Sequence, residues 1–427
     1  MEYDIGKGLR ATLDVPVVVA LSQVGEKRWG RHQFAVISEY PGGRILFRYH
    51  AGEDAVTAYG KPSPTYISSD KGTTWQPLSV DGLPSSGMTY PLFGGEFICL
   101  PMALPLNLEK ENIALPKPVG RYRCYAWNLL FRLDECPMPV QRFFEHMECA
   151  RWRPASKRWK KDNILYDKKN ALIWTRESGN ASRMVPRTVF ERPPLRVGKE
   201  LLHAEYRTKY LSDDGTVPKQ ARVTCMFSQD NGRTWKRRST IAFDPLGKDA
   251  LTESTLAENV NGELVCVIRR ADQNQKSMMI TFSRDLGKTW EKPAALNDLG
   301  GFGVMPSLVC LECGVMVLSY GRPGIWLSFS LNGTGRTWTR PVCILGRDDA
   351  KRGKANLTRN VSTDGYTTML PTGPSQLLMS YSRFDHKDAQ GKQRKAVLVR
   401  KVTISSKGHR RKNGEQGAPA DADKLRR

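Results

Sequence analysis

The sequence predicts an all-β fold built from many short antiparallel strands, and three observations lead to this prediction. Short apolar runs rich in β-branched and aromatic residues, such as RVTCMFS and ELVCVIRR, recur along the chain between turn residues. One turn motif returns several times. Between its copies a second pattern repeats, in which a glycine-bearing turn is followed by an apolar run that ends in aromatic residues or arginine.

The composition fits a folded chain with a large core. Hydrophobic residues make up 40% and aromatic residues 9% of the 427 residues, which excludes a disordered or collagen-like chain. A chain of this length usually divides into two or three domains unless it is built from repeats. The repeats therefore decide the expected domain organisation.

The turn motif reads S-x-D-x-G-x-T-W and occurs at 68–75, 228–235 and 283–290, with a degenerate copy at 330–338 that has Asn332 in place of Asp. Each copy follows a short strand-like run. An aspartate side chain can accept hydrogen bonds from the N–H groups of a tight turn, and glycine supplies a positive φ. We expect the tryptophan to pack beneath the turn. Each copy is thus predicted to be a hairpin turn with a structural role.

The spacing of the motif predicts a β-propeller. The last three motif tryptophans are 55 and 48 residues apart, the length of one four-stranded blade. The gap from Trp75 to Trp235 holds about eight strand-like runs, among them QRFFEHMECARW, and eight strands make two blades with one hidden motif. The prediction is a six-bladed propeller of four-stranded antiparallel blades. Twelve strands in the gap would instead make seven blades.

The second repeated pattern places arginines at one face of the propeller. Strand ends in a propeller point to the central face, so arginines at the ends of these runs are expected there. The arginines concerned are Arg48, Arg207, Arg269, Arg270, Arg322 and Arg383.

The two ends of the sequence predict ring closure and a tail. The apolar run Val15–Leu21 is expected to join the last blade, because closing the ring removes exposed sheet edges. Residues 1–404 then form a single domain, and the polar, basic residues 405–427 form a disordered tail. No signal peptide and no membrane span is visible, so the expected location is cytoplasmic, or secreted if the N-terminus is truncated.

The net charge of +23, from 66 basic and 43 acidic residues, predicts an anionic partner. No nucleic-acid-binding motif is present and the basic residues are scattered, so nucleic acid is not the expected partner. The nine cysteines lie mostly inside apolar runs and are expected to be reduced. Cys310 and Cys313 lack the further ligands of a zinc site, and no metal is expected.

The repeated turn is identified as the Asp box of the sialidase (neuraminidase) superfamily, and the resemblance extends from about Trp29 to Phe384. It implies an exo-glycosidase that hydrolyses a terminal carboxylated sugar, with an anionic glycan as partner and no cofactor. In this family three arginines bind the carboxylate, a tyrosine assisted by a glutamate is the nucleophile, and an aspartate is the acid/base. A neutral phenol suits an anomeric centre whose carboxylate would repel a carboxylate nucleophile.

The first matches to the family lie before the first Asp box. In RILFRYHAGED, Arg48 resembles the sugar-contacting arginine and Asp54 resembles the acid/base. Arg31, in RWGRHQF, falls where the first arginine of the carboxylate-binding triad is expected, although the Arg-Ile-Pro signature of the family is missing.

The next match lies in LTESTLAENVNGELVCVIRR. Glu253 resembles the glutamate that assists the nucleophile, and Arg269, sixteen residues later, resembles the second triad arginine. Glu258 and Arg270 are neighbours that could take these roles instead.

The last matches complete the set. Arg322, in LSYGRPG, resembles the third triad arginine, and Tyr366, in DGYTTML, resembles the nucleophile of the last blade. Groups that act on one sugar must converge, so Arg269, Arg322 and Tyr366 are expected to lie within about 15 Å of one another.

Two further functions remain open. Asp boxes also occur in polysaccharide lyases, in which arginine neutralises a uronate carboxylate and a base removes the C5 proton; His50 is the candidate base for that reaction. Asp boxes occur as well in non-catalytic propellers, so a glycan-binding protein is the third possibility.

Overall fold

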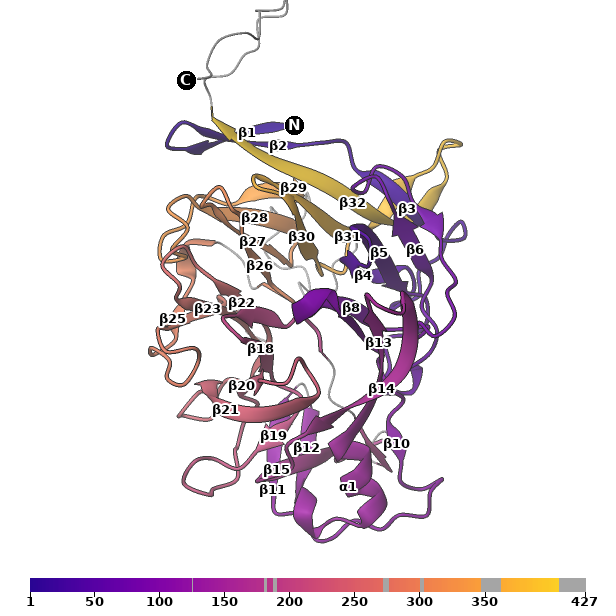
Figure 1. Ribbon diagram of the computed structural model, residues 1–427, viewed down its shortest axis with the longest axis vertical. Coiled ribbons are helices and arrows are strands. Elements are labelled where there is room, and N and C mark those ends of the chain that lie inside the picture. The colour runs from indigo at the N-terminus through magenta and orange to yellow at the C-terminus, as the bar shows by residue number, and fades with distance from the viewer. Residues whose placement is uncertain are drawn as a thin grey trace, which may run out of the picture.

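The computed structural model describes residues 1–124, 126–179, 183–186, 190–271, 276–299, 303–346 and 362–406. Strands dominate these residues, and the single α-helix among them is α1 (Met138–Glu145). The predicted all-β class is confirmed. Figure 1 shows the sheets arranged around a common centre.

Three of the sheets are four-stranded antiparallel meanders in chain order. Their strands are β4 (Gln33–Tyr40), β5 (Arg44–His50), β6 (Thr65–Ser68) and β7 (Gln76–Pro77); β22 (Leu251–Glu258), β23 (Leu264–Arg270), β24 (Met279–Ser283) and β25 (Ala294–Ala295); and β26 (Ser307–Cys310), β27 (Met316–Gly321), β28 (Ile325–Ser330) and β29 (Val342–Leu345).

A fourth sheet has eight strands and consists of two antiparallel halves. One half is β8 (Met88–Pro91), β9 (Phe97–Leu100), β13 (His146–Arg153) and β14 (Arg158–Tyr166), and the other is β17 (Leu195–Val197), β18 (Glu200–Glu205), β20 (Val223–Ser228) and β21 (Thr234–Ala242). The halves are joined by the parallel pairing of the outer strands β14 and β21.

The last sheet contains strands from both ends of the chain. Its strands are β30 (Thr368–Gly373), β31 (Gln376–Lys387), β32 (Gln393–Ser406), β1 (Glu2–Gly6), β2 (Leu9–Leu13) and β3 (Val17–Leu21). Because β3 pairs antiparallel with β32, the predicted closure by Val15–Leu21 is confirmed. Strand β2 also pairs with β32, which was not predicted. Since β32 includes Ser405 and Ser406, the strand runs past the predicted start of the tail; residues 407–427 lie outside the described residues.

The sheets follow one another around the ring and the last contacts the first. Strand β4 contacts β8, β18 contacts β22, β22 contacts β26, β26 contacts β30, and β30 and β31 contact β4. Strands such as β23 are buried on both faces, which is why their sequences read as continuous apolar runs instead of alternating ones. Apolar clusters between adjacent sheets form the core; one joins Val265 and Val267 to Leu318 and Tyr320.

The repeated motif forms the turn between the third and fourth strands of its sheet, as predicted. In the copy between β24 and β25, Asp285 Oδ1 accepts the N–H groups of Lys288 (3.0 Å) and Thr289 (2.9 Å), and Asp285 Oδ2 accepts the Thr289 hydroxyl (2.6 Å). Gly287 has a φ of +78°, and Trp290 Nε1 donates to its carbonyl at 3.2 Å. The polar groups of the motif therefore form hydrogen bonds with one another within the turn.

One predicted strand run was partly wrong. In QRFFEHMECARW, the residues up to Glu145 belong to α1, and the strand β13 starts at His146. Pro139 in the first turn of the helix fixes a φ compatible with it, and the helix buries Val140 against the sheet.

An additional four-stranded sheet stands beside the ring, at the lower end of the molecule in Figure 1. Its strands are β11 (Gly120–Cys124), β12 (Ala126–Arg132), β15 (Ala171–Arg176) and β19 (Lys209–Tyr210), and a short pair near it is β10 (Leu106–Asn107) and β16 (Met184–Val185). These strands come from three different connections between strands of the eight-stranded sheet. We call the four-stranded unit the inserted sheet.

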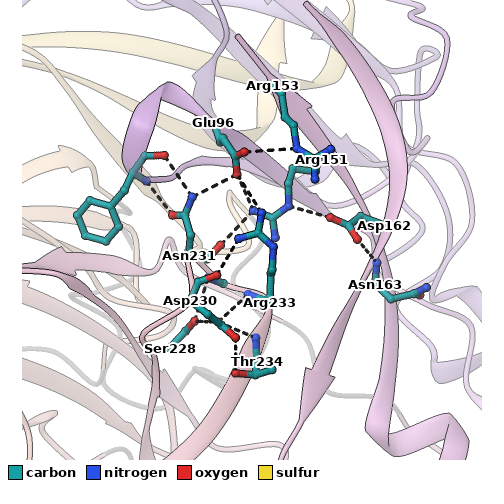
Figure 2. Close-up of polar contacts among 12 residues, drawn as sticks. Glu96, Arg151, Arg153, Asp162, Asn163, Ser228, Asp230, Asn231, Arg233 and Thr234 are labelled. Atoms are coloured by element: carbon teal, nitrogen blue, oxygen red, sulfur yellow. Dashed lines mark hydrogen bonds and ion pairs between the residues drawn. The ribbon is translucent and has the colours of Figure 1, made fainter. Parts of the chain in front are cut away.

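A buried arginine fixes the junction inside the eight-stranded sheet (Figure 2). The Arg151 side chain is 1% exposed and donates to Asp162 Oδ2 (2.8 Å), Glu96 Oε2 (3.2 Å) and the Asn231 carbonyl (3.0 Å). Asn231 belongs to a motif turn of the other half, and its side-chain amide bonds both backbone groups of Phe93. The Arg151 cluster therefore ties one half of the sheet to the other.

No helix among the residues that the structure describes has the length and apolar character needed to cross a bilayer. All nine cysteines are free.

Candidate active site

Six of the residues predicted from the sequence line one cavity of about 1000 Å³: Asp54, Arg207, Glu253, Arg269, Arg322 and Tyr366. They lie at one end of the sheets, at the edge where the first strand of each sheet begins and the second strand ends. The Arg322 guanidinium carbon lies 5.4 Å from the centre of the Tyr366 ring, and Arg269 Nη1 lies 3.4 Å from Tyr366 Oη. The expected convergence of these three residues is therefore present.

Strand irregularities and strand ends position these side chains. Glu253 lies where the register of the β22–β23 pair shifts between Thr252 and Ser254, and such a bulge re-aims a side chain. Arg269 lies near the end of β23, opposite Thr252. Arg322 follows β27, and Tyr366 precedes β30.

Glu253 is held by three donors. Arg269 Nη1 donates to both Glu253 oxygens at 2.7 Å, and Tyr366 Oη donates to Oε1 at 2.7 Å. The backbone N–H of Met305 donates to Oε2 at 2.8 Å. The carboxylate of Glu253, 7% exposed, therefore bridges the guanidinium and the phenol.

These contacts set the ionisation of Glu253. Burial alone would raise its pKa, but the charge of Arg269 and the hydrogen bonds from Arg269 and Tyr366 outweigh burial, so the pKa lies below the usual glutamate value. Glu253 is consequently ionised at neutral pH and can accept a proton from the tyrosine.

Arg322 presents a guanidinium to the cavity. Its Nε donates to the Asp364 carbonyl at 2.9 Å, and its carbon lies 5.6 Å from the Trp29 ring centre. No hydrogen bond from its terminal nitrogens to another described residue is found, and Arg322 lines the cavity, so its guanidinium is available to an anion there.

Asp54 lies in the loop that follows β5. Its Oδ2 accepts the indole N–H of Trp29 at 2.9 Å, and its side chain is exposed. It lines the large cavity and also a smaller one of about 210 Å³, which Glu253 and Tyr366 line as well.

Arg31 lines neither cavity, and Arg48, predicted as a sugar-contacting arginine, lines only the smaller one. Arg48 is 3% exposed and donates to the carbonyls of Pro84 (2.6 Å), Ser86 (2.6 Å) and Gly87 (3.0 Å), so its donors are engaged by backbone. Arg31 is 34% exposed in its side chain, and its nearest described acid is Glu26 at 4.0 Å. We therefore leave both out of the proposed carboxylate-binding set.

Arg270 and Glu258, which the sequence also offered for the roles of Arg269 and Glu253, lie apart from the Glu253–Tyr366 pair, whereas His50, the candidate base of a lyase, lines the same smaller cavity as that pair. Arg270 forms an ion pair with Asp249, and Glu258 lies at the far end of β22. His50 lines the smaller cavity, with Nδ1 2.9 Å from the Gly30 carbonyl.

Glu191 was missed by the sequence analysis. It lines the smaller cavity, and its Oε1 accepts Arg207 Nε at 2.7 Å and Tyr206 Oη at 3.0 Å. Burial raises its pKa in spite of the Arg207 charge. Its Oε2 is buried without a hydrogen-bond partner in the described part of the chain. No motif surrounds Glu191, because it lies in an irregular segment between β16 and β17.

Basic side chains outnumber acidic ones in the wall of the large cavity. The basic ones are Lys27, Arg176, Arg207, Lys209, Arg269, Arg322 and Lys395, and the acidic ones are Glu26, Asp54 and Glu253. Burial lowers the pKa of Lys209 to about 8. A site with this excess of positive charge attracts an anionic ligand. The described residues contain no group of three or more histidine, cysteine or acidic side chains that could hold a metal.

A ring of antiparallel sheets with a polar cavity at one end is a β-propeller-like fold. No family model matches the chain, and no curated protein matches its sequence.

Solved structures match at low identity. A Dyadobacter fermentans protein of unknown function is 17% identical and has a TM-score of 0.59, with 93% of this chain and 100% of that chain covered. The family GH93 α-L-arabinofuranosidase of Fusarium graminearum is 14% identical, with a TM-score of 0.52 and coverage of 91% and 97%. The NanB sialidase of Streptococcus pneumoniae is 14% identical, with a TM-score of 0.47 and coverage of 91% and 70%. At these identities the likeness concerns the fold alone.

Proposed function

We propose that the chain is a glycoside hydrolase of the sialidase type, which removes a terminal carboxylated sugar from a glycan. The observation that carries the proposal is the hydrogen bond of 2.7 Å from Tyr366 Oη to the ionised Glu253, beside Arg269. A phenol bonded to a buried carboxylate is the nucleophile–base pair needed when the anomeric carbon carries a negative substituent.

In this mechanism Glu253 takes the phenolic proton as Tyr366 Oη attacks the anomeric carbon. Asp54 protonates the leaving glycosidic oxygen, and the bond between that oxygen and the anomeric carbon breaks. Asp54 then removes a proton from water, which attacks the same carbon; the bond from that carbon to Tyr366 Oη breaks, and Glu253 returns the proton to Tyr366. Arg322, with Arg269, would bind the sugar carboxylate. The configuration of the sugar is retained.

We infer six blades for the ring and a single domain for residues 1–406. Counting the eight-stranded sheet as two blades, with the three meanders and the closing sheet, supports six. The turn between β13 and β14 supports the hidden motif, because it occupies the motif's place and leads to the buried Trp159. The inserted sheet is then an elaboration of loops instead of a seventh blade.

The test is hydrolysis of a fluorogenic sialoside by the wild type, Tyr366→Phe and Tyr3→Phe. Loss of the nucleophile is expected to lower kcat roughly 10³-fold. The control removes a hydroxyl whose contact is a peripheral carbonyl, that of Cys343, and is expected to keep full activity. Wild-type turnover that survives in Tyr366→Phe would refute the tyrosine mechanism.

A second candidate is a hydrolase of neutral sugars that uses two carboxylates. Glu191 and Glu253 both line the smaller cavity, the charge of Glu253 contributes to the raised pKa of Glu191, and the pKa of Glu253 is lowered. Opposite shifts in neighbouring carboxyls suit an acid and a nucleophile or base. Under this function Glu191→Gln, and not Tyr366→Phe, abolishes cleavage of neutral aryl glycosides such as an α-L-arabinofuranoside.

A lyase and a glycan-binding protein would give distinct readouts. A lyase with His50 as base would generate the ultraviolet absorbance of an unsaturated uronate. A non-catalytic glycan-binding protein would bind the sialoside without cleaving it, and Asp54→Ala would leave that binding intact.

A further inference from the structure

The inserted sheet turns one face toward the large cavity. Side chains alternate along a strand, and the cavity-lining residues of β11 and β15 are the alternate ones: Tyr122 and Cys124, and Trp174 and Arg176. The pairing places Tyr122 opposite Asn128, and Asn128 opposite Arg176, in a row across three strands. A continuous sheet face therefore forms this wall.

Trp174 offers a fixed aromatic surface on this wall. Its indole N–H donates to the Arg207 carbonyl at 3.1 Å, and its ring meets that of Tyr122 edge to face at 6.2 Å between centres. The side chain remains partly exposed. A partly exposed aromatic ring held on two sides is a rigid surface for the apolar face of a sugar.

Arg176 adds a cation on the same wall. It is exposed, lies about 7 Å further along the strand from Trp174, and forms no ion pair with a described residue. Arg207 and Lys209, which also line the cavity, are basic too. An anionic group is the ligand that this arrangement accepts.

This wall adjoins the proposed reacting groups. Cys124, at the end of β11, lies close enough to Arg269 and Glu253 for their charges to influence its thiol. Arg207 connects the two regions, because its guanidinium binds Glu191 and its carbonyl accepts the Trp174 indole N–H.

We propose that Trp174 and Arg176 form the subsite for the part of the substrate beyond the cleaved bond, and that this part is a sugar carrying an acidic group. The inference rests on the proposed function and extends it. A terminal carboxylated sugar occupies Arg269 and Arg322, and the next sugar stacks on Trp174 with its acidic group at Arg176. The substrate class is then an oligomer of consecutive acidic sugars.

The experiment compares two substrates with the same terminal sugar. One is a disaccharide of two sialic acids, whose leaving group is acidic, and the other is sialyl-lactose, whose leaving group is neutral. Arg176→Gln is expected to lower kcat/KM for the acidic disaccharide roughly tenfold, the worth of one charge-assisted hydrogen bond, and to change sialyl-lactose less than twofold. Trp174→Ala is expected to lower both.

Arg121→Gln is the matched control. Arg121 lies on β11 but on the other face of the inserted sheet, where it is 54% exposed and pairs with Glu177. Arg121→Gln removes the same charge from the same sheet and is expected to change the hydrolysis of neither substrate. Equal losses for both substrates in Arg176→Gln, or the same selective loss in Arg121→Gln, would overturn the proposal.

Calorimetric titration of the acidic disaccharide separates this proposal from the proposed function. If the wild type cleaves no substrate, hydrolysis fails as a function. The subsite then stands if Arg176→Gln weakens binding of the disaccharide roughly tenfold while binding of free sialic acid is unchanged. The subsite proposal is refuted if the wild type does not bind the disaccharide, or if the wild type and Arg176→Gln bind it equally well.

Discussion

Replacing Arg151 by Met tests how the two halves of the eight-stranded sheet are held together. The substitution keeps most of the side-chain volume and removes the charge and three hydrogen bonds. Breaking a buried ion pair on one side costs about 3–5 kcal/mol, because a charge stays behind unpaired. Here Glu96 keeps Arg153 and Arg233 as partners, and Asp162, which loses its partner, is 31% exposed and regains some water. We therefore expect the lower end, about 3 kcal/mol.

The assay is thermal unfolding, with Arg153→Met as the control. For a chain of this length, an unfolding entropy of about 2.1 cal/mol/K per residue converts 3 kcal/mol into a drop in Tm of roughly 3–4 °C. Arg153 pairs with the same Glu96 at 3.4 Å but is 49% exposed, and a surface pair contributes about 0–1 kcal/mol. Its removal is expected to lower Tm by no more than about 1 °C.

Equal shifts for the two variants would refute the reasoning, since they would mean that burial of the Arg151 pair has no effect on stability. The double variant that adds Asp162→Asn gives a second check. Among the described residues Asp162 pairs only with Arg151, so the added change removes the charge that was left unpaired, and part of the lost stability is expected to return.

Three other predictions concern the turns and the candidate site. Asp285→Ala removes the hydrogen bonds that close its turn and is expected to cost about 1–2 kcal/mol in denaturant unfolding, whereas Asp81→Ala, in an exposed loop, is expected to cost less than about 0.5 kcal/mol. Because the pKa of Glu253 is lowered, its base form persists below the usual glutamate range and is lost only as pH falls through that lowered pKa; the kcat/KM profile should therefore keep its acid limb below about pH 4.5, and a limb near pH 6 would contradict this assignment. Arg269→Met leaves Glu253 buried without its ion pair and is expected to destabilise the fold by about 3 kcal/mol, while Arg322→Met, which breaks no ion pair in the described residues, is expected to cost under about 1 kcal/mol in the same unfolding assay.

Local patterns predicted the sheets and turns well. In a motif turn such as that of Asp285, the hydrogen-bond partners of the carboxylate lie within five residues in the chain. The structure of the turn could therefore be inferred from the sequence alone. The sixteen-residue spacing of Glu253 and Arg269 also indicated a real contact, because both residues lie on one hairpin, β22–β23, and their side chains meet across it.

Features decided by distant segments could not be predicted in this way. The Arg48 guanidinium binds the carbonyls of Pro84 and Gly87, which lie in the connection between β7 and β8, and nothing near Arg48 in the sequence indicates this contact. The inserted sheet is assembled from three separate connections, so no local run distinguishes its strands from those of the ring. Glu191 reaches the smaller cavity from an irregular segment for the same reason.

The closing sheet has a consequence for the order of assembly. The other sheets of the ring pair mainly strands that are neighbours in the chain, and hairpins of this kind can form early because little loop entropy is lost. In the closing sheet Val17 pairs with Val399, so this step must bring together segments separated by most of the chain. We therefore expect the pairing of β3 with β32 to form last. The cavity is lined by Trp29, which follows β3, and by Phe384 and Lys395, which lie in β31 and β32. Its wall is therefore complete only once the ring has closed.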